Sequence, residues 1–568
     1  MYDRINAIIS SADEGRADAG TYGRVYAGTY AEEAAGTDTG LCNIGRSMEM
    51  GEHIVSTTVG KVRGYERNGM VEYLGIPYAQ APVGPLRFKR AAARTPWEDV
   101  FDAKEYGPAP IQLNNGRVMG DEDCLTVNVQ RPLEGENLPV FVWIYGGGYN
   151  TGYSSDEMYR GEAFVKDGVL FVSFNYRTNV MGFYDFTTYP GCEDFDSNCG
   201  LSDQILALNW IHENVAAFGG DPDRITIGGE SAGGASVVNM LACPGVKGTF
   251  RQAIIESGLP NCMMTHQTAR ENIDLFLEGM HWTEKDLPRL RTEDPRLFLL
   301  GNEYVAAKHQ YKNPGMFLPG PVQDDLMPVR PIDAIRGGSA EGIRLIIGTN
   351  MHEGTMFVHP DNTGFPNSWT MITEMLEKNG HADALPQIVG FYHPSANDSF
   401  TLYQDSAKSL ASGIPPLTGD VRQAGGDPFI RFATDYAFEM PAVKVAMAQK
   451  TYTPDVWMYR YELVTKAGLE SGWKASHAFE LPAVFVKPAH PFSHFAFDGE
   501  PQEVFDSIAG DMHGDWVSFI KTGNPDTEWS RFEGADSPVK IYDRKSRTER
   551  LDRRHLMEVW GDLRFYEA

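Results

Sequence analysis

The chain has 568 residues, 42% of them hydrophobic and 22% charged, which is the composition of a globular protein with a sizeable core. Its 50 basic and 77 acidic residues give a formal net charge of −27, so electrostatic repulsion argues against nucleic acid and anionic lipid surfaces as partners. No apolar run approaches the ~20 residues that a membrane-spanning helix needs.

The N-terminal segment, residues 1–52, is rich in Ala, Gly, Glu and Asp and lacks apolar periodicity, so we expect an extension of unknown role. Its first twenty residues lack the continuous apolar region of a secretory signal. The cysteines fit no zinc spacing and are too sparse for a dense disulfide framework; they are Cys42, Cys124, Cys192, Cys199, Cys243 and Cys262. These features predict a cytoplasmic protein.

Beyond the extension, apolar runs alternate with segments of helical periodicity. LPVFVWIYGGG (138–148), GVLFVSFNYR (168–177) and RITIGG (224–229) predict buried strands, and LSDQILALNWIHENVAAFG (201–219) predicts a helix. Nearly continuous hydrophobic strands separated by helices indicate the α/β class, with a mostly parallel sheet covered on both faces. With no internal repeat, we expect one catalytic domain over 53–568, with a helix-rich insertion at about 355–470.

A serine stands between two glycines in ITIGGESAGGAS (225–236). Ser231 follows a strand candidate and precedes a small-residue run that can begin a helix, which is the strand, turn, helix order of a nucleophile elbow. Glycines at 229 and 233 suit this turn, because larger side chains would collide with the neighbouring strand and helix. The motif alone leaves a structural glycine-rich turn open as the alternative.

A second glycine group, in WIYGGGYN (143–150), comes directly after a strand candidate. An oxyanion hole needs backbone N–H groups close to the reacting carbonyl, and glycines allow that approach. Gly147, Gly148 and Ala232 are the predicted donors, although a glycine triplet after a strand also occurs in plain loops.

A nucleophilic serine needs a histidine base and a carboxylate that orients it, in the chain order Ser, acid, His for this fold class. Spacing alone does not choose among the histidines after the serine. They are His266, His281, His309, His352, His359, His381, His393, His477, His490, His494, His513 and His555.

Taken together, these segments resemble the type B carboxylesterases, the family that includes the cholinesterases, from about residue 54 to the C-terminus. The resemblance rests on LGIPYAQAPVGPLRF, DEDCLTVNV, YGGGY and NYRTNVMGF, on the block that ends in GGESAGG, and on GTNMHEGTMF and ASHAFELPAVF further on. It implies an α/β-hydrolase fold, a large mostly parallel sheet flanked by helices, with helical insertions over the active site.

By this resemblance the acid is Glu353 and the base is His477, completing a catalytic triad with Ser231. The implied mechanism is acyl transfer through an acyl-enzyme, for which neither a metal nor an organic cofactor is needed. The order Ser231, Glu353, His477 agrees with the order expected for α/β-hydrolases.

The resemblance also implies supporting residues. Arg87 is expected to pair with Glu122, Ser257 to lie behind the catalytic carboxylate, and Glu230 to reach into the substrate pocket. Met263 and Met264 are expected to form a flexible apolar wall beside the acyl group.

The chain departs from the family's secreted members in its cysteines. Cys124 matches one half of a family disulfide whose partner is missing, and Cys192 with Cys199 could form a local bridge or remain two thiols. The segment QLNNGRVMGDE (112–122) lacks the aromatic residue that binds quaternary ammonium in cholinesterases, which disfavours a choline ester.

The predicted function is therefore a serine carboxylic-ester hydrolase acting on small to medium apolar esters. The physiological bond could instead be a thioester, amide or carbamate, because one acyl-enzyme mechanism serves all of them. A non-catalytic binding or adhesion protein of the same fold is the alternative from another class, and the sequence leaves the oligomeric state open. The glycine loops fit neither a P-loop nor a dinucleotide fingerprint.

Overall fold

The computed structural model describes residues 53–114, 116–258, 263–358, 365–392, 428–525, 528–561 and 563–566. The predicted extension and two of the six cysteines, Cys42 and Cys262, lie outside these ranges.

One large sheet runs through the molecule, with strand order β1-β2-β3-β7-β9-β8-β10-β11-β12-β13-β14-β15 and β4 paired to β2. Every neighbouring pair from β9 to β14 is parallel, and the flanking pairs β1–β2, β2–β3, β3–β7, β7–β9 and β14–β15 are antiparallel. The strands are β1 (His53–Thr57), β2 (Gly60–Arg67), β3 (Met70–Pro77), β4 (Phe101–Asp102), β7 (Thr126–Pro132), β8 (Leu138–Ile144), β9 (Leu170–Phe174), β10 (Gly220–Glu230), β11 (Gln252–Glu256), β12 (Arg344–Asn350), β13 (Val456–Tyr461), β14 (Pro538–Tyr542) and β15 (Arg547–Arg550). A separate hairpin joins β5 (Gln112–Asn114) to β6 (Arg117–Met119).

Helices connect and cover these strands. They are α2 (Glu162–Lys166), α3 (Asn179–Phe183), α4 (Cys199–Asn214), α5 (Ala232–Ala242), α6 (His266–Met280), α7 (Phe298–Lys312), α8 (Pro331–Arg336), α9 (Trp369–Lys378), α10 (Leu385–Tyr392), α12 (Pro428–Thr434), α13 (Met440–Lys450), α14 (Lys466–Ser471), α15 (Leu481–Val484), α16 (Pro491–Phe497), α17 (Gln502–Thr522) and α18 (Arg554–Trp560). None of the helices in the described ranges combines the length and apolar character that crossing a lipid bilayer requires.

The two faces of the sheet carry separate hydrophobic cores, because successive side chains of a strand point to opposite faces. In β8, Val140 and Val142 pack into the core with α4, α5, α8 and α13, whereas Phe141 and Trp143 pack into the core with α15 and α17. Every residue of β8 after Leu138 is buried, as a strand covered on both faces requires.

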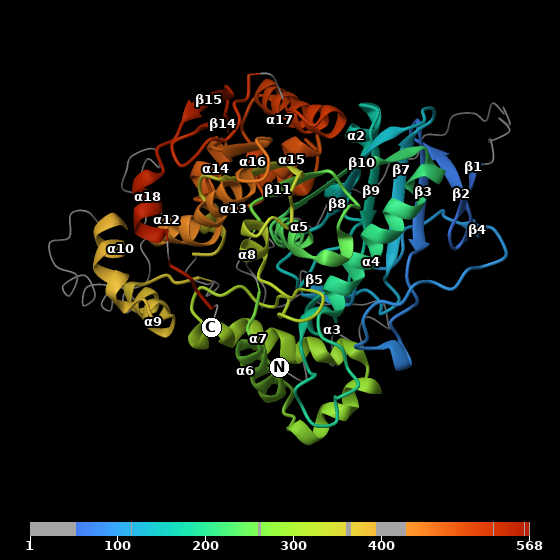
Figure 1. Ribbon diagram of the computed structural model, residues 1–568, viewed down its shortest axis with the longest axis horizontal. Helices are drawn as coiled ribbons and strands as arrows, with labels where there is room; N and C mark the ends of the chain where they lie inside the picture. Colours follow the sequence, from blue (N-terminus) through green and yellow to red (C-terminus); the bar gives the residue numbers. More distant parts are fainter. Residues whose placement is uncertain are drawn as a thin grey trace, which may run out of the picture.

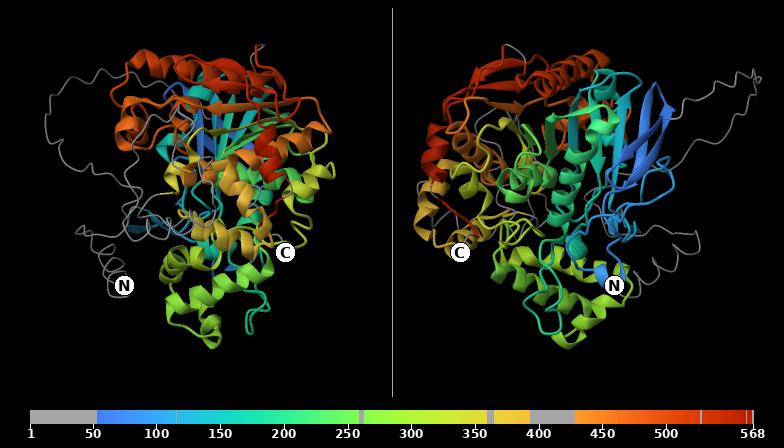
Figure 2. Two further views of the ribbon diagram at one scale, coloured as in Figure 1. Left: turned by 90° about the vertical axis from the view of Figure 1, so that its left-hand side faces the viewer. Right: turned by 45° about the vertical axis from the view of Figure 1, so that its right-hand side comes forward.

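Figure 1 shows the sheet edge-to-edge, from β1, β2 and β4 at one end to β14 and β15 at the other. Helices α6 and α7 lie side by side at one end of the molecule, away from the sheet (Figures 1 and 2), over a third core that includes Phe276 and Phe298. This layered arrangement confirms the predicted α/β class.

The predicted strands are present as β8, β9 and β10, and the predicted helix is present as α4. Within 355–470 the described residues form α9, α10, α12 and α13, but Val456–Tyr461 forms β13, which pairs with β12 in the central sheet. The helical stretch is therefore interrupted by β13, and α14 begins after that strand.

Candidate active site

Ser231 occupies a strained turn between β10 and α5, with φ 58° and ψ −122°. Residues other than glycine rarely adopt a positive φ, and the conformation costs about 1–3 kcal/mol. Two backbone hydrogen bonds hold it: Ser231 N–H donates to the carbonyl of Glu256 at 2.9 Å, and Ala235 N–H donates to the carbonyl of Ser231 at 2.8 Å. The serine keeps part of its surface exposed while all of α5 behind it is buried.

Close backbone contacts explain the glycines of the turn. A Cβ on Gly229 would lie 2.5 Å from the carbonyl carbon of Gly233, and one on Gly233 would overlap the carbonyl oxygen of Ile144 at the end of β8. The glycine loop after β8 reaches the same place, since a Cβ on Gly146 would lie 3.2 Å from Cβ of Ser231. The structure therefore brings the two predicted glycine motifs together.

Gly147 and Gly148 follow in this loop with φ 108° and 62°. Gly147 is exposed, and its carbonyl accepts hydrogen bonds from the N–H groups of Asn150 and Thr151, both at 3.0 Å. These bonds fix a tight turn beside Ser231 and the first residue of α5, Ala232.

Glu353 and His477 meet although 124 residues separate them in the chain. Nδ1 of His477 lies 2.5 Å from Oε2 of Glu353. The other carboxylate oxygen accepts hydrogen bonds from the Ser257 hydroxyl at 2.5 Å and from Asn350 N–H at 2.6 Å. Three donors surround this fully buried carboxylate, so the arrangement stabilises its negative charge and fixes the imidazole ring.

The second ring nitrogen of His477 lies 3.0 Å from Oε1 of Glu230, the residue before the serine. The angles do not suit a hydrogen bond: within the described part of the chain, Nε2 of His477 and Oε1 of Glu230 are both buried without a hydrogen-bond partner. Burial and the nearby charge of Glu353 raise the pKa of Glu230 well above its usual range.

Two phenylalanine rings pack against the imidazole of His477. The centroids of Phe357 and Phe438 lie 5.1 Å and 4.9 Å from that of the imidazole ring. Phe317 and Phe365 complete a cluster with them, and Phe317 and Phe357 keep part of their surface exposed. An apolar wall therefore borders the histidine.

Phe438 belongs to a π-helical turn, Asp435–Glu439, between α12 and α13. Such turns are rare and recur at functional sites. Here the turn aims Phe438 at His477, while Glu439 accepts from the hydroxyl of Thr349 and pairs with Arg553.

Met263 and Met264 are both buried in the core on the α4 and α5 face. The sulfur of Met264 accepts a hydrogen bond from the amide of Asn272 at 3.2 Å. Their predicted part in an acyl pocket stays a prediction.

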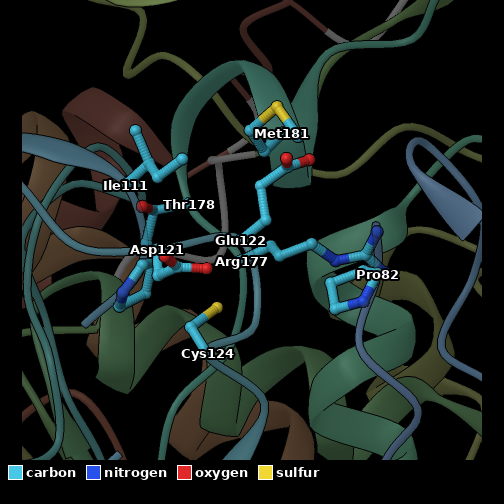
Figure 3. A pocket seen from close by; sticks show the side chains of 9 residues that line it. Pro82, Ile111, Asp121, Glu122, Cys124, Arg177, Thr178 and Met181 are labelled. Atoms are coloured by element: carbon cyan, nitrogen blue, oxygen red, sulfur yellow. The ribbon is translucent and has the colours of Figure 1, made fainter. Parts of the chain in front are cut away.

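Arg87 and Glu122 form a two-point ion pair, with Nε to Oε1 and Nη2 to Oε2 both at 2.6 Å. Arg87 also donates hydrogen bonds to the carbonyls of Leu290 and Glu293. These bonds join the segment between β3 and β4, which carries Arg87, to the segment before α7. Glu122 lines a small pocket with Cys124 and Arg177 (Figure 3).

The cysteines of the described residues, Cys124, Cys192, Cys199 and Cys243, are all free and buried. Cys192 and Cys199 therefore do not form the local bridge that the sequence left open. Burial raises the pKa of the Cys192 thiol to about 11, which keeps it protonated and unreactive.

Removing one member of the Arg87–Glu122 pair should destabilise the fold. We expect Glu122→Gln to lower the free energy of unfolding by about 3 kcal/mol, because it leaves a largely buried guanidinium without its counter-charge. Chemical denaturation measures this, with the exposed Glu98→Gln as the matched control. An unchanged midpoint in Glu122→Gln would show that the backbone carbonyls alone satisfy Arg87.

Comparison with known proteins shows the family to which this chain belongs. A family model described as the carboxylesterase family matches residues 51–560. The chain is 36% identical over 495 residues to para-nitrobenzyl esterase of Bacillus subtilis (strain 168), covering 84% of this chain and 92% of that protein. It is 30% identical over 505 residues to phenmedipham hydrolase of Pseudarthrobacter oxydans, covering 86% and 94%.

Among solved structures, a PNB esterase superposes with a TM-score of 0.74 at 33% identity, over 89% of this chain and 99% of that one. The family model spans the sheet and every segment of the site described above. The chain belongs to the carboxylesterase family of α/β-hydrolases and is a serine carboxylic-ester hydrolase.

Proposed function

We propose that Ser231, His477 and Glu353 carry the hydrolysis as nucleophile, general base and orienting carboxylate. The observation that carries this proposal is the 2.5 Å contact between His477 Nδ1 and Glu353 Oε2 beside a strained, partly exposed serine. Glu353 holds the proton of the imidazole on Nδ1, which leaves Nε2 free to accept the serine proton.

In the first half-reaction Ser231 attacks the ester carbonyl while His477 takes its proton and passes it to the leaving alcohol. Water then attacks the acyl-enzyme with the same base, and the acid is released. Catalytic hydrogen bonds are often long before substrate binds, and this proposal requires the imidazole to turn from Glu230, the residue before the serine, so that Nε2 faces the serine hydroxyl.

The negative charge of the tetrahedral intermediate needs hydrogen-bond donors. Gly147, Gly148 and Ala232 are our proposed donors through their backbone N–H groups, because their segments meet at Ser231. Each such donor contributes about 10²–10³ in rate.

We assign small to medium apolar esters as substrates. The partly exposed rings of Phe317 and Phe357 offer apolar surface beside His477, and para-nitrobenzyl esterase is a relative. Four buried free thiols support a reducing compartment such as the cytoplasm.

An activity panel of p-nitrophenyl esters with apolar acyl groups of increasing length and with a charged acyl group, combined with a phosphonate probe and peptide mapping, tests the proposal. We expect turnover to be highest for short to medium acyl chains and the label to be on Ser231. Label on another serine would reject the nucleophile, and equal rates for apolar and charged acyl groups would reject the substrate class.

A further inference from the structure

Four glutamates lie buried in the protein interior, and two of them, Glu230 and Glu353, contact the imidazole of His477. Glu230, Glu256, Glu353 and Glu480 are each at most 3% exposed. Among the described residues, none of the four forms an ion pair with a lysine or an arginine, and the basic side chain that contacts two of them, Glu230 and Glu353, is His477. Four negative charges in this space would face at most one positive charge, so several of the carboxyl groups must hold protons.

The sheet register explains why these groups lie together. Glu230 and Glu256 end the neighbouring parallel strands β10 and β11 and are direct register partners, on strands ~4.8 Å apart. Glu256 is level with Gly348 of β12, and Gly348 is level with Tyr459 of β13, whose ring covers the glycine. Register partners on neighbouring strands point to the same face of the sheet. For these strands that face is the one covered by α17, because Glu256 accepts a hydrogen bond from Trp516 of that helix.

Glu256 and Glu353 differ in what surrounds them. Glu353 accepts from three donors, whereas Glu256 accepts from one, Trp516 Nε1–H at 2.7 Å. The other oxygen of Glu256, Oε2, is buried without a partner in the described residues, as are Oε1 of Glu480 and the hydroxyl of Tyr459. Unpartnered oxygens on groups that interact electrostatically with one another fit carboxyl groups that hold protons, with a buried water as a further partner.

We propose that Glu256 is a positioning residue of the esterase: it is a neutral carboxylic acid at neutral pH, and its proton keeps His477 from being held as an imidazolium. The inference rests on the proposed role of His477 as the base. Ionised Glu256 would add a negative charge on the strand next to Glu230, whose Oε1 lies 3.0 Å from Nε2 of His477, and charge at this place would favour the protonated ring, which cannot accept the proton of Ser231.

The titratable groups that face Glu256 come from every element packed around it. They are Glu230 from β10, Tyr459 from β13, Glu480 before α15 and Tyr159 between β8 and α2, and Glu353 is held by the hydroxyl of Ser257, the residue after Glu256. Burial raises the pKa of Glu256 to about 8, and the Trp516 hydrogen bond opposes part of that rise. Burial and the surrounding carboxylates raise the pKa of Glu480 well above its usual range as well.

The sign of the effect on stability follows from linkage. Between the ordinary glutamate pKa of ~4.3 and about 8, the folded protein holds a proton on Glu256 that the unfolded chain has lost. The contribution of Glu256 to stability is therefore fully present below this window and falls as the pH rises through it. Glu256→Gln keeps the shape of the neutral acid and removes this dependence.

We expect the difference in melting temperature, Glu256→Gln minus wild type, to become more positive from pH 5 to pH 8. A difference that is constant or becomes more negative would overturn the proposal, because an ionised Glu256 stabilises most at high pH. Glu303→Gln on α7, where burial alone raises the pKa, is the matched control away from the site. It should leave the pH profile of ester hydrolysis unchanged.

Two further readouts separate this inference from the proposed catalytic triad. At pH 7 the infrared band of protonated carboxylic acids should be weaker in Glu256→Gln than in the wild-type protein. In the wild-type protein this band should titrate near pH 8. A band that does neither would overturn the inference. Neither measurement depends on catalysis. In the activity profile, Glu256→Gln should keep kcat/KM within about threefold at pH 7 and exceed wild type above pH 8, and a variant that loses activity at every pH would refute the positioning role.

Discussion

Ser231→Ala is expected to abolish ester hydrolysis while leaving the protein folded. Without the hydroxyl no acyl-enzyme forms, and kcat should fall by up to about 10⁶-fold, to the residual catalysis that binding and oxyanion donors supply. Stability should change by less than ~0.5 kcal/mol, because the backbone hydrogen bonds that hold the turn remain.

Steady-state kinetics with a short p-nitrophenyl ester measures the loss, and thermal unfolding checks the fold. Ser471→Ala, at an exposed helix end, is the control and should behave as wild type. If Ser231→Ala kept activity within tenfold of wild type, Ser231 would not be the nucleophile.

Glu353→Gln is the second change with a large expected effect. The amide keeps the shape of the carboxylate but loses its charge, and its N–H₂ group would face Nδ1 of His477, stabilising the tautomer whose Nε2 carries the proton. That tautomer cannot accept the serine proton, so kcat should fall by about 10⁴-fold.

The pH–rate profile and kcat of Glu353→Gln, with the exposed Glu374→Gln as control, measure this effect. We expect kcat and kcat/KM to fall together, since the lost interaction acts in the transition state. An unchanged kcat would mean that another carboxylate orients His477, and Glu230, 3.0 Å from Nε2, would be the first to examine.

The sheet could be predicted from the sequence because a strand that is buried on both faces is apolar along its whole length, and such a run is visible in a few consecutive residues. LPVFVWI and LFVSF are continuous apolar runs, and they form β8 and β9. The turn at Ser231 could be predicted for a similar reason. Its glycines are needed because a side chain there would clash with residues a few positions away and with the neighbouring strand β8.

The acid and the base could not be chosen from local pattern. Their contact spans 124 residues, and twelve histidines follow the serine, so only the resemblance to a family selected Glu353 and His477. The contact of Phe438 with His477 was not predicted. Phe438 lies in a π-helical turn, and such a turn has no regular hydrophobic period in the sequence. Glu256 left a readable signal, a carboxylate that follows the apolar residues AII in the strand QAIIE, beside the strand that carries Glu230.

The conformation of Ser231 has a consequence for the resistance of the whole protein to heat. A serine at φ 58° holds about 1–3 kcal/mol of backbone strain that a glycine at the same place would not. Since whole domains are stable by only ~5–15 kcal/mol, this one residue lowers the margin against thermal inactivation noticeably. Engineering for thermostability should therefore leave this turn untouched and look for compensation elsewhere in the fold, because replacing Ser231 with glycine would remove the proposed nucleophile.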